Sequence, residues 1–198
     1  MTETVDEVFL NEVKITDRTA NAGALGLMAF GMTTIILNLH NAGLFGMGSV
    51  IFAMGIFYGG LAQVIVGILE WKKSNTFGMA AFVSYGFFWI ILVFILLMPT
   101  LGWTPAFDKA SFVAFLTLWG IFSLVMFVIT LRLSKALQVV FGSVVILFFM
   151  LAIGNALGSE IILKFAGIEG IICGATALYT GLGEVMNEVY KEKIVKLG

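Results

Sequence analysis

The sequence contains little charge. Only 12% of its 198 residues are charged, whereas soluble domains carry about 25%. Hydrophobic residues make up 60% of the chain, and the mean hydropathy is +1.06. These values exclude a soluble globular domain. The net charge of −1 offers no basic surface, so nucleic acid is not predicted as a partner.

Cysteine and histidine are nearly absent. A single cysteine, Cys173, excludes an internal disulfide and a multi-cysteine metal site, and we expect it to be a small core residue. The single histidine, His40, follows an apolar run. It is either an interfacial hydrogen bonder or a pH-sensitive, anion-attracting group, because histidine ordinarily titrates near neutral pH. No metal or cofactor is predicted.

Targeting and catalytic motifs are also missing. The first eighteen residues are acidic and mixed, without the basic and apolar regions of a signal peptide. We therefore expect residues 1–20 to remain as a cytosolic arm. HEXXH, GxSxG, Walker and Rossmann patterns do not occur. The sequence does not predict an enzyme.

Long apolar runs are what the chain does contain. A membrane-spanning helix needs about 20 mostly apolar residues, and six runs meet that length: Gly23–Leu39, Met47–Leu69, Phe77–Met98, Ser111–Leu131, Leu137–Leu157 and Phe165–Val185. Both prolines are expected in one loop, after the third run. The sequence predicts an all-α membrane protein with six transmembrane helices in one domain, 21–188, followed by a cytosolic tail, 189–198.

The basic residues predict the orientation. With six spans, nine basic residues fall on the side shared by both termini: Lys14, Arg18, Lys72, Lys73, Arg132, Lys135, Lys191, Lys193 and Lys196. Only Lys109 and Lys164 fall on the other side. Because basic loops stay in the cytoplasm, we expect a multi-pass protein of the cell inner (plasma) membrane with both termini inside.

Glycines recur at spacings that permit close helix packing. Gly55 and Gly59 form one GxxxG pair, and Gly170 and Gly174 form another. Such pairs let backbones touch. They serve either packing within the chain or contacts between subunits.

The spans hold neutral polar groups and few titratable ones. Thr33, Thr34 and Asn38 lie in the first run; the threonines either bond back to helix carbonyls or donate to a solute. Glu70 and Glu184 are expected at cytoplasmic ends. Glu184 either lines a vestibule or covers solvated helix surface. The lack of deeper titratable groups argues against a proton-pump relay.

The segment NAGALGLMAFGMTT resembles the NPAPLGL signature of the succinate–acetate permease family, the acetate uptake transporters. Ala22 and Ala24 stand where that signature has prolines. The stretches AMGIFYGGLAQ, FVSYGFFW, LAIGNALG and GEVMNE are also similar to the bacterial branch. The resemblance implies six helices, cytoplasmic termini, a pore within each protomer, and a homohexamer.

The resemblance also implies the site. Its narrow hydrophobic gate falls on Phe30, Tyr85 and Val144, where the family usually has Leu at the third place. The substrate-binding candidates are Asn21, Thr33, Thr34, Asn38, Gln63, Gln138, Asn155 and Ala177, and the candidate pH-sensing or vestibule residues are His40 and Glu184.

These expectations favour transport of acetate and similar small monocarboxylates, and of succinate in some family members, by a channel-like or proton-coupled route. Thr, Asn, Gln and Tyr donors would replace part of the solute's hydration. One alternative is an acetate-binding membrane sensor or scaffold. Another is a channel for a different small solute, such as water, ammonia or glycerol.

Overall fold

The computed structural model describes residues 19–198, which form helices and turns without a strand. The elements are α1 (Ala22–Asn41), α2 (Ser49–Ala53), the π-helical η1 (Met54–Ala62), α3 (Gln63–Lys72), α4 (Thr76–Thr100), α5 (Lys109–Thr130), α6 (Lys135–Leu157) and α7 (Glu160–Tyr190). Because α2, η1 and α3 are continuous, these helices amount to six segments long and apolar enough to cross a membrane. The predicted number of spans is confirmed.

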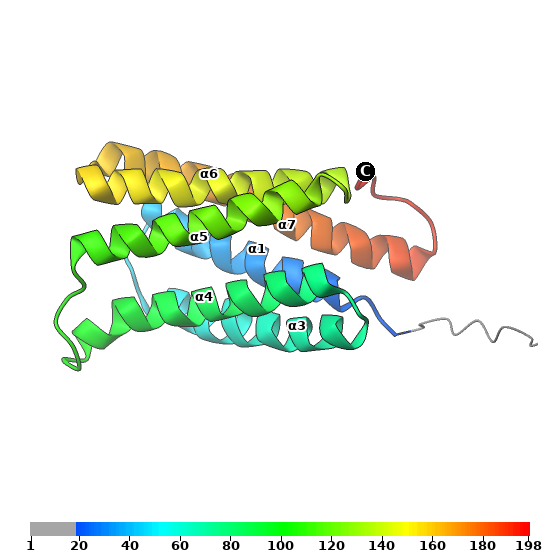
Figure 1. Ribbon diagram of the computed structural model, residues 1–198, viewed down its shortest axis with the longest axis horizontal. Helices are drawn as coiled ribbons and strands as arrows, with labels where there is room; N and C mark the ends of the chain where they lie inside the picture. The colour runs from blue at the N-terminus through cyan, green and yellow to red at the C-terminus, as the bar shows by residue number, and fades with distance from the viewer. Residues whose placement is uncertain (1–18) are drawn as a thin grey trace, which may run out of the picture.

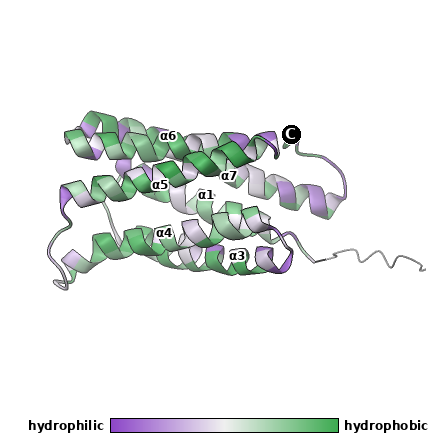
Figure 2. Cartoon of the chain, viewed as in Figure 1, coloured by the Kyte–Doolittle hydropathy of each residue, from purple (hydrophilic) through white to green (hydrophobic). Residues whose placement is uncertain are grey.

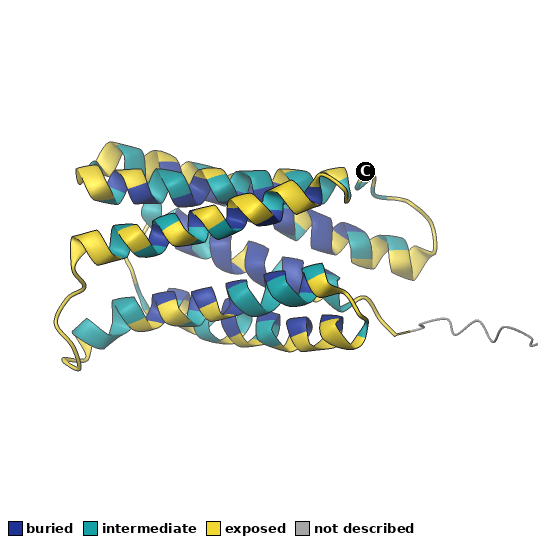
Figure 3. Cartoon of the chain, in the orientation of Figure 1, coloured by how far each residue is buried: buried dark blue, intermediate teal, exposed yellow. Residues whose placement is uncertain are grey.

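The helices form an elongated antiparallel bundle (Figure 1). Hydrophobic residues cover the middle of its outer surface, and hydrophilic ones gather toward the helix ends (Figure 2). Buried residues face inward and exposed ones outward (Figure 3). This is the distribution expected of a bundle whose sides face lipid, because hydrocarbon solvates apolar side chains at no cost.

The α1–α7 pair makes the most extensive helix contact in the bundle, and glycine makes it possible. A Cβ built on Gly31 would lie 2.6 Å from the Gly174 carbonyl oxygen, and one on Gly174 would lie 2.6 Å from the Gly31 oxygen. Gly55 and Gly59 likewise face Val93 and Trp89 of α4. Both GxxxG pairs therefore serve packing within the chain, as the first of the two alternatives supposed.

Side-chain caps fix where the later helices begin. Asn75, Asp108, Ser134 and Ser159 each accept a hydrogen bond from a backbone N–H in the first turn of α4, α5, α6 and α7. Asn21 precedes α1 but makes no such cap. Its side chain is used elsewhere, as described below.

Two local features differ from the sequence prediction. Pro99 lies inside the last turn of α4 rather than in the following loop. A proline there removes one helical hydrogen bond, which is tolerated because α4 ends at the next residue, Thr100. The second span contains the π-helical turns of η1, whereas an unbroken α-helix was expected. Segments of this kind are frequent at functional sites.

The predicted arm falls mostly on residues 1–18, which lie outside the described part of the chain. At the other end α7 continues to Tyr190, two residues beyond the predicted boundary. The tail then folds back, because the Asn187 amide exchanges two hydrogen bonds of 2.8 Å with the Val195 backbone. The N–H of Ala136, at the start of α6, donates to the Leu197 carbonyl at 2.9 Å.

Candidate functional site

Two cavities lie within the bundle, one toward each end. The terminal cavity, of about 140 Å³, lies near the described ends of the chain, among the starts of α1, α4 and α6 and the last turns of α3 and α7. The distal cavity, of about 580 Å³, lies at the opposite end. Phe30 and Val144 line both cavities. The two cavities therefore meet at these two side chains.

The three residues expected at the gate come together at this meeting point. Phe30 of α1, Tyr85 of α4 and Val144 of α6 are at most 8% exposed. The rings of Phe30 and Tyr85 lie 5.8 Å apart, and Tyr85 lines the terminal cavity. Tyr85 is also packed against Phe122 and Phe141, so its ring is held from several sides.

The Tyr85 hydroxyl group has a definite hydrogen-bond direction. The Ser123 hydroxyl donates to the Trp119 carbonyl at 2.7 Å, and Tyr85 Oη lies 2.8 Å from Ser123 Oγ. Since Ser123 has only one hydroxyl proton, Tyr85 is the donor in the second bond. The Tyr85 oxygen therefore has only lone pairs left for any further hydrogen bond. The expectation that tyrosine would donate to the solute is wrong for this residue.

Two amide–carboxylate pairs stand at the wall of the terminal cavity. Asn21 Nδ2 donates to Glu184 Oε2 at 2.9 Å, and Asn75 Nδ2 donates to Glu70 Oε2 at 2.5 Å. All four residues line the cavity. Glu184 thus lines this cavity, and its place in a cytoplasmic vestibule stays a prediction. Asn21 anchors the start of α1 through Glu184, where the family signature has a neighbouring proline.

Gln63 is the buried polar residue of this cavity. It is the first residue of α3 and follows η1 directly. Its side chain is 1% exposed and lines the terminal cavity. Its amide oxygen has no hydrogen-bond partner in the described part of the chain.

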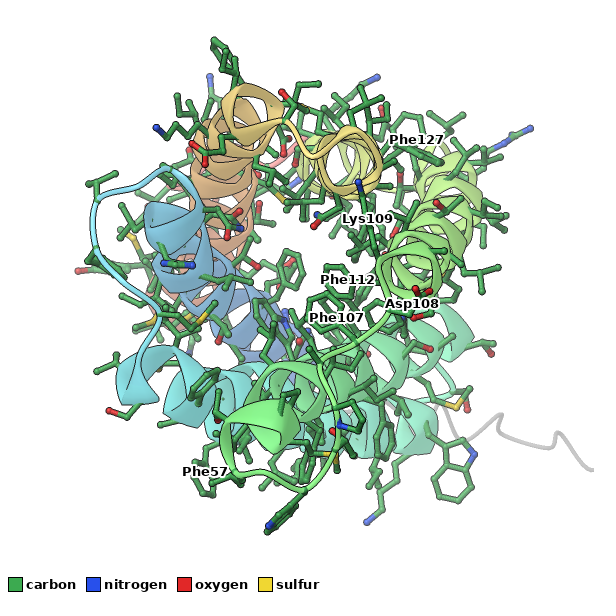
Figure 4. The ribbon with its side chains drawn as sticks, turned by 90° about the vertical axis from the view of Figure 1, so that its left-hand side faces the viewer. Phe57, Phe107, Asp108, Lys109, Phe112 and Phe127 are labelled. Atoms are coloured by element: carbon green, nitrogen blue, oxygen red, sulfur yellow. The ribbon has the colours of Figure 1, made fainter. Side chains whose placement is uncertain are left out.

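The distal cavity is larger and contains both charged and neutral polar groups. Its lining includes four sequence candidates, Thr34, Asn38, His40 and Asn155, together with Glu160 and Lys164. Figure 4 views this end, with Phe107 and Phe112 directed toward the interior. Both line the cavity, with ring centroids 4.5 Å apart. These two rings add an aromatic part to the polar lining of the cavity.

Some polar groups of the distal cavity have hydrogen-bond partners and others do not. Asn38 donates to the Thr34 carbonyl at 2.9 Å and accepts from Asn41 at 3.0 Å. His40 Nδ1 donates to the Phe45 carbonyl at 2.9 Å, since a carbonyl oxygen can only accept. Among the described residues, Thr34 Oγ1 and Trp89 Nε1 are buried without a hydrogen-bond partner. Both residues line the cavity, so their hydrogen-bonding capacity is unused there.

Trp89 was not among the sequence candidates. A tryptophan in a membrane span is usually a packing residue, and the sequence carries no signal that its N–H lies unpaired beside a cavity. Its position depends on η1, where Gly59 leaves room for the Trp89 ring; a Cβ at Gly59 would lie 2.9 Å from Trp89 Cγ.

Three candidates lie away from both cavities. Thr33 faces Gly59 of η1, Ala177 is fully buried within α7, and Gln138 bonds to the Leu133 carbonyl at 3.4 Å. Within residues 19–198, neither the Thr33 hydroxyl nor that of Thr34 has a hydrogen-bond partner. The alternative that these threonines bond back to helix carbonyls is therefore wrong.

One titratable residue within a span departs from the expected lack of such groups. Glu169 lies in α7, inside the predicted sixth run, and its Oε2 is buried without a hydrogen-bond partner in the described part of the chain. It lines neither cavity. In the described chain, no group of three or more His, Cys, Asp or Glu residues could hold a metal ion.

Comparison with known proteins places this architecture among membrane transport proteins. Residues 10–194 match the GPR1/FUN34/yaaH family. The succinate-acetate/proton symporter SatP of Escherichia coli (strain K12) is 54% identical over 179 residues, which are 90% of this chain and 95% of that protein. The ammonia transport outward protein 2 of Saccharomyces cerevisiae is 33% identical; its match covers 81% of this chain and 59% of that protein.

A solved structure shares the fold. The structure of the bacterial acetate channel SatP superposes with a TM-score of 0.90 at 54% sequence identity. The match covers 91% of this chain and all of the other. Similarity at this level extends to the whole helical bundle.

Proposed function

Because the chain belongs to the GPR1/FUN34/yaaH family, we propose that it transports acetate, related small carboxylates and protons across a membrane, as a transporter or channel rather than an enzyme. The observation that carries this proposal is the pair of cavities that meet at Phe30 and Val144. They stand in a chain 54% identical to a succinate-acetate/proton symporter. The route runs through one chain, between the two cavities.

The distal cavity is suited to receive the carboxylate. Bringing an ion into hydrocarbon costs tens of kcal/mol by a Born estimate, so a membrane path must supply compensating groups. Lys164 and His40 line this cavity, and the unpaired Thr34 hydroxyl and Trp89 N–H can donate to a carboxylate oxygen. Asn38 and Asn155 add polar surface. The solute gains partners here before it reaches the constriction.

The constriction is the proposed gate. Phe30, Tyr85 and Val144 present two rings and one aliphatic side chain, which admit a small flat solute only after it sheds its water. The family resemblance implies Leu at the position of Val144, so valine leaves the opening one methylene wider. The terminal cavity then receives the solute on the other side.

Orientation and assembly are part of the same proposal. The nine-to-two distribution of basic residues supports cytoplasmic termini, so the terminal cavity opens toward the cytosol and the distal cavity toward the outside. The protein then belongs in the inner (plasma) membrane, with the arm of residues 1–20 and the tail from 189 to 198 inside. The family resemblance supports a homohexamer with one path per protomer.

A second candidate is the passage of a small neutral solute such as ammonia. A constriction made mainly of apolar groups favours neutral solutes over ions, and one relative is named for ammonia transport. A sensor that binds acetate without moving it has no comparable support.

The deciding experiment is uptake of labelled acetate into proteoliposomes, with protein-free liposomes as the baseline. We expect uptake above the baseline and competition by unlabelled acetate but not by ammonium. Val144→Leu should lower propionate uptake relative to acetate by about tenfold, the effect of one methylene in an apolar pocket. Val139→Leu, on the outer face, is the control. Uptake equal to the baseline would refute acetate transport, and an unchanged ratio in Val144→Leu would remove Val144 from the gate.

A further inference from the structure

We propose that the terminal cavity recognises the neutral carboxylic acid rather than its anion, through the side-chain amide of Gln63. This inference rests on the proposed function and specifies which chemical form passes the constriction. It assigns proton coupling to hydrogen bonding by Gln63, with the proton travelling on the solute.

Gln63 is the side chain whose bonding is incomplete at this cavity. A buried polar group without a partner is costly, yet the Gln63 side chain is 1% exposed and its oxygen has no partner among the residues that the structure describes. The other polar side chains of the lining are engaged: Asn21 with Glu184, Asn75 with Glu70, and Tyr85 with Ser123. The structure therefore leaves one amide at the cavity for a solute.

The charges of the lining oppose an anion. Of the residues that line the terminal cavity, α3 contributes Glu70, α4 contributes Tyr85 and α7 contributes Glu184, while α1 and α6 contribute no titratable group. No Lys, Arg or His is among them. A carboxylate that entered would meet two carboxyl groups and no cation.

Hydrogen-bond complementarity points to the same form. A primary amide offers N–H donors and a carbonyl acceptor on one edge, and a carboxylic acid offers the matching C=O and O–H. The two can pair through two hydrogen bonds at once. The acid's single O–H proton can therefore satisfy the Gln63 oxygen, which has no partner among the described residues. An anion has no proton to donate and would leave that oxygen unsatisfied.

The proton can cross with the carboxylate without a relay of protein side chains. On the distal side the carboxylate takes a proton from hydronium to give the acid and water. The acid crosses the constriction, and on the terminal side it returns the proton to water. One proton moves with each carboxylate and no net charge crosses, so Glu169 and Cys173 are not required as carriers.

Acetamide provides a direct test in wild-type proteoliposomes. It matches acetic acid in shape and can donate and accept, but it does not ionise in this range. We expect acetamide to inhibit acetate uptake equally at about pH 6 and about pH 8, while the apparent KM for acetate rises about tenfold per pH unit. We also expect lumenal acidification during uptake, at a rate that does not change when a potassium diffusion potential is imposed.

Variants assign the effect to Gln63. Gln63→Met keeps the length of the side chain and should raise the acetate KM about tenfold and abolish acetamide inhibition. Gln138→Met, the matched change outside both cavities, should leave both unchanged. Acetate uptake that follows the imposed potential, or that acetamide does not inhibit, would overturn this inference while leaving acetate transport intact. Uptake no faster than in protein-free liposomes would instead refute the proposed function.

Discussion

Thr33 and Thr34 are neighbours in α1, yet their hydroxyl groups have different surroundings. Both are buried and have no hydrogen-bond partner in the described chain, but Thr34 lines the distal cavity and Thr33 faces Gly59. The side chains of successive helical residues point about 100° apart. One of two neighbours can therefore face a cavity while the other faces an adjacent helix. The role of each threonine therefore depends on which helix it faces.

Replacing Thr34 by Val should weaken acetate transport without destabilising the fold. Valine has nearly the same shape and removes a hydroxyl without a partner, so we expect stability to stay equal or rise by about 1 kcal/mol. The acetate KM should rise about threefold, because a donor to the carboxylate is lost. Thermal unfolding in detergent and proteoliposome uptake measure the two effects.

The control is Thr33→Val, which removes the adjacent unpaired hydroxyl away from both cavities. It should change stability in the same direction and leave the acetate KM unaltered. Equal rises in KM for the two variants would contradict the assignment of Thr34 alone to the path.

At the scale of the helix, the α1–α7 contact and η1 position the site. The close approach of Gly31 and Gly174 fixes this part of α1. It therefore holds Phe30, the residue before Gly31, at the boundary of the two cavities. On the other side, η1 changes the helical register between α2 and α3, immediately before Gln63. The direction of the Gln63 amide thus follows from a backbone irregularity, in addition to its place in the sequence.

Gly174→Ala tests the α1–α7 contact. The added methyl group would lie 2.6 Å from the Gly31 carbonyl oxygen, so the helices must separate, at a cost of about 1–3 kcal/mol. We expect a lower unfolding temperature in detergent and reduced acetate uptake. Gly46→Ala, with nothing within 4 Å of the added atom, should change neither. A Gly174→Ala variant as stable as the wild type would show that the helices are not in direct backbone contact.

For the whole molecule, the arrangement of charge predicts the orientation in the membrane. We expect a cysteine placed at Gly46, in the distal loop, to react with an impermeant maleimide added outside intact cells. A cysteine at Glu192, in the tail, should react only after the cells are opened. Native Cys173 is 0% exposed and should give no background. Labelling of Glu192→Cys from outside would reverse the orientation and the direction of the proposed path.

The number of spans and their approximate limits follow from the sequence, because length and hydropathy decide which segments can enter a bilayer. The proposed gate residues Phe30, Tyr85 and Val144 follow from a family resemblance, and the structure brings them together. The position of Pro99 inside α4 and the π-helical turns of η1 differ from the sequence prediction for a physical reason. A helix surrounded by lipid and apolar neighbours shows no clear hydrophobic period, so the sequence does not mark where its backbone departs from the α-helix.

The sequence by itself determined that this protein is a six-helix membrane bundle with few titratable groups, because the transfer of each residue between water and hydrocarbon is a local property. Only the tertiary structure decided which polar groups are left unpaired. Gln138 is bonded near a helix end, whereas Gln63 is buried beside a cavity. Asn21 holds Glu184 instead of capping its helix. Hydrogen bonds depend on partners far away in the chain, and those distances are set when the helices pack.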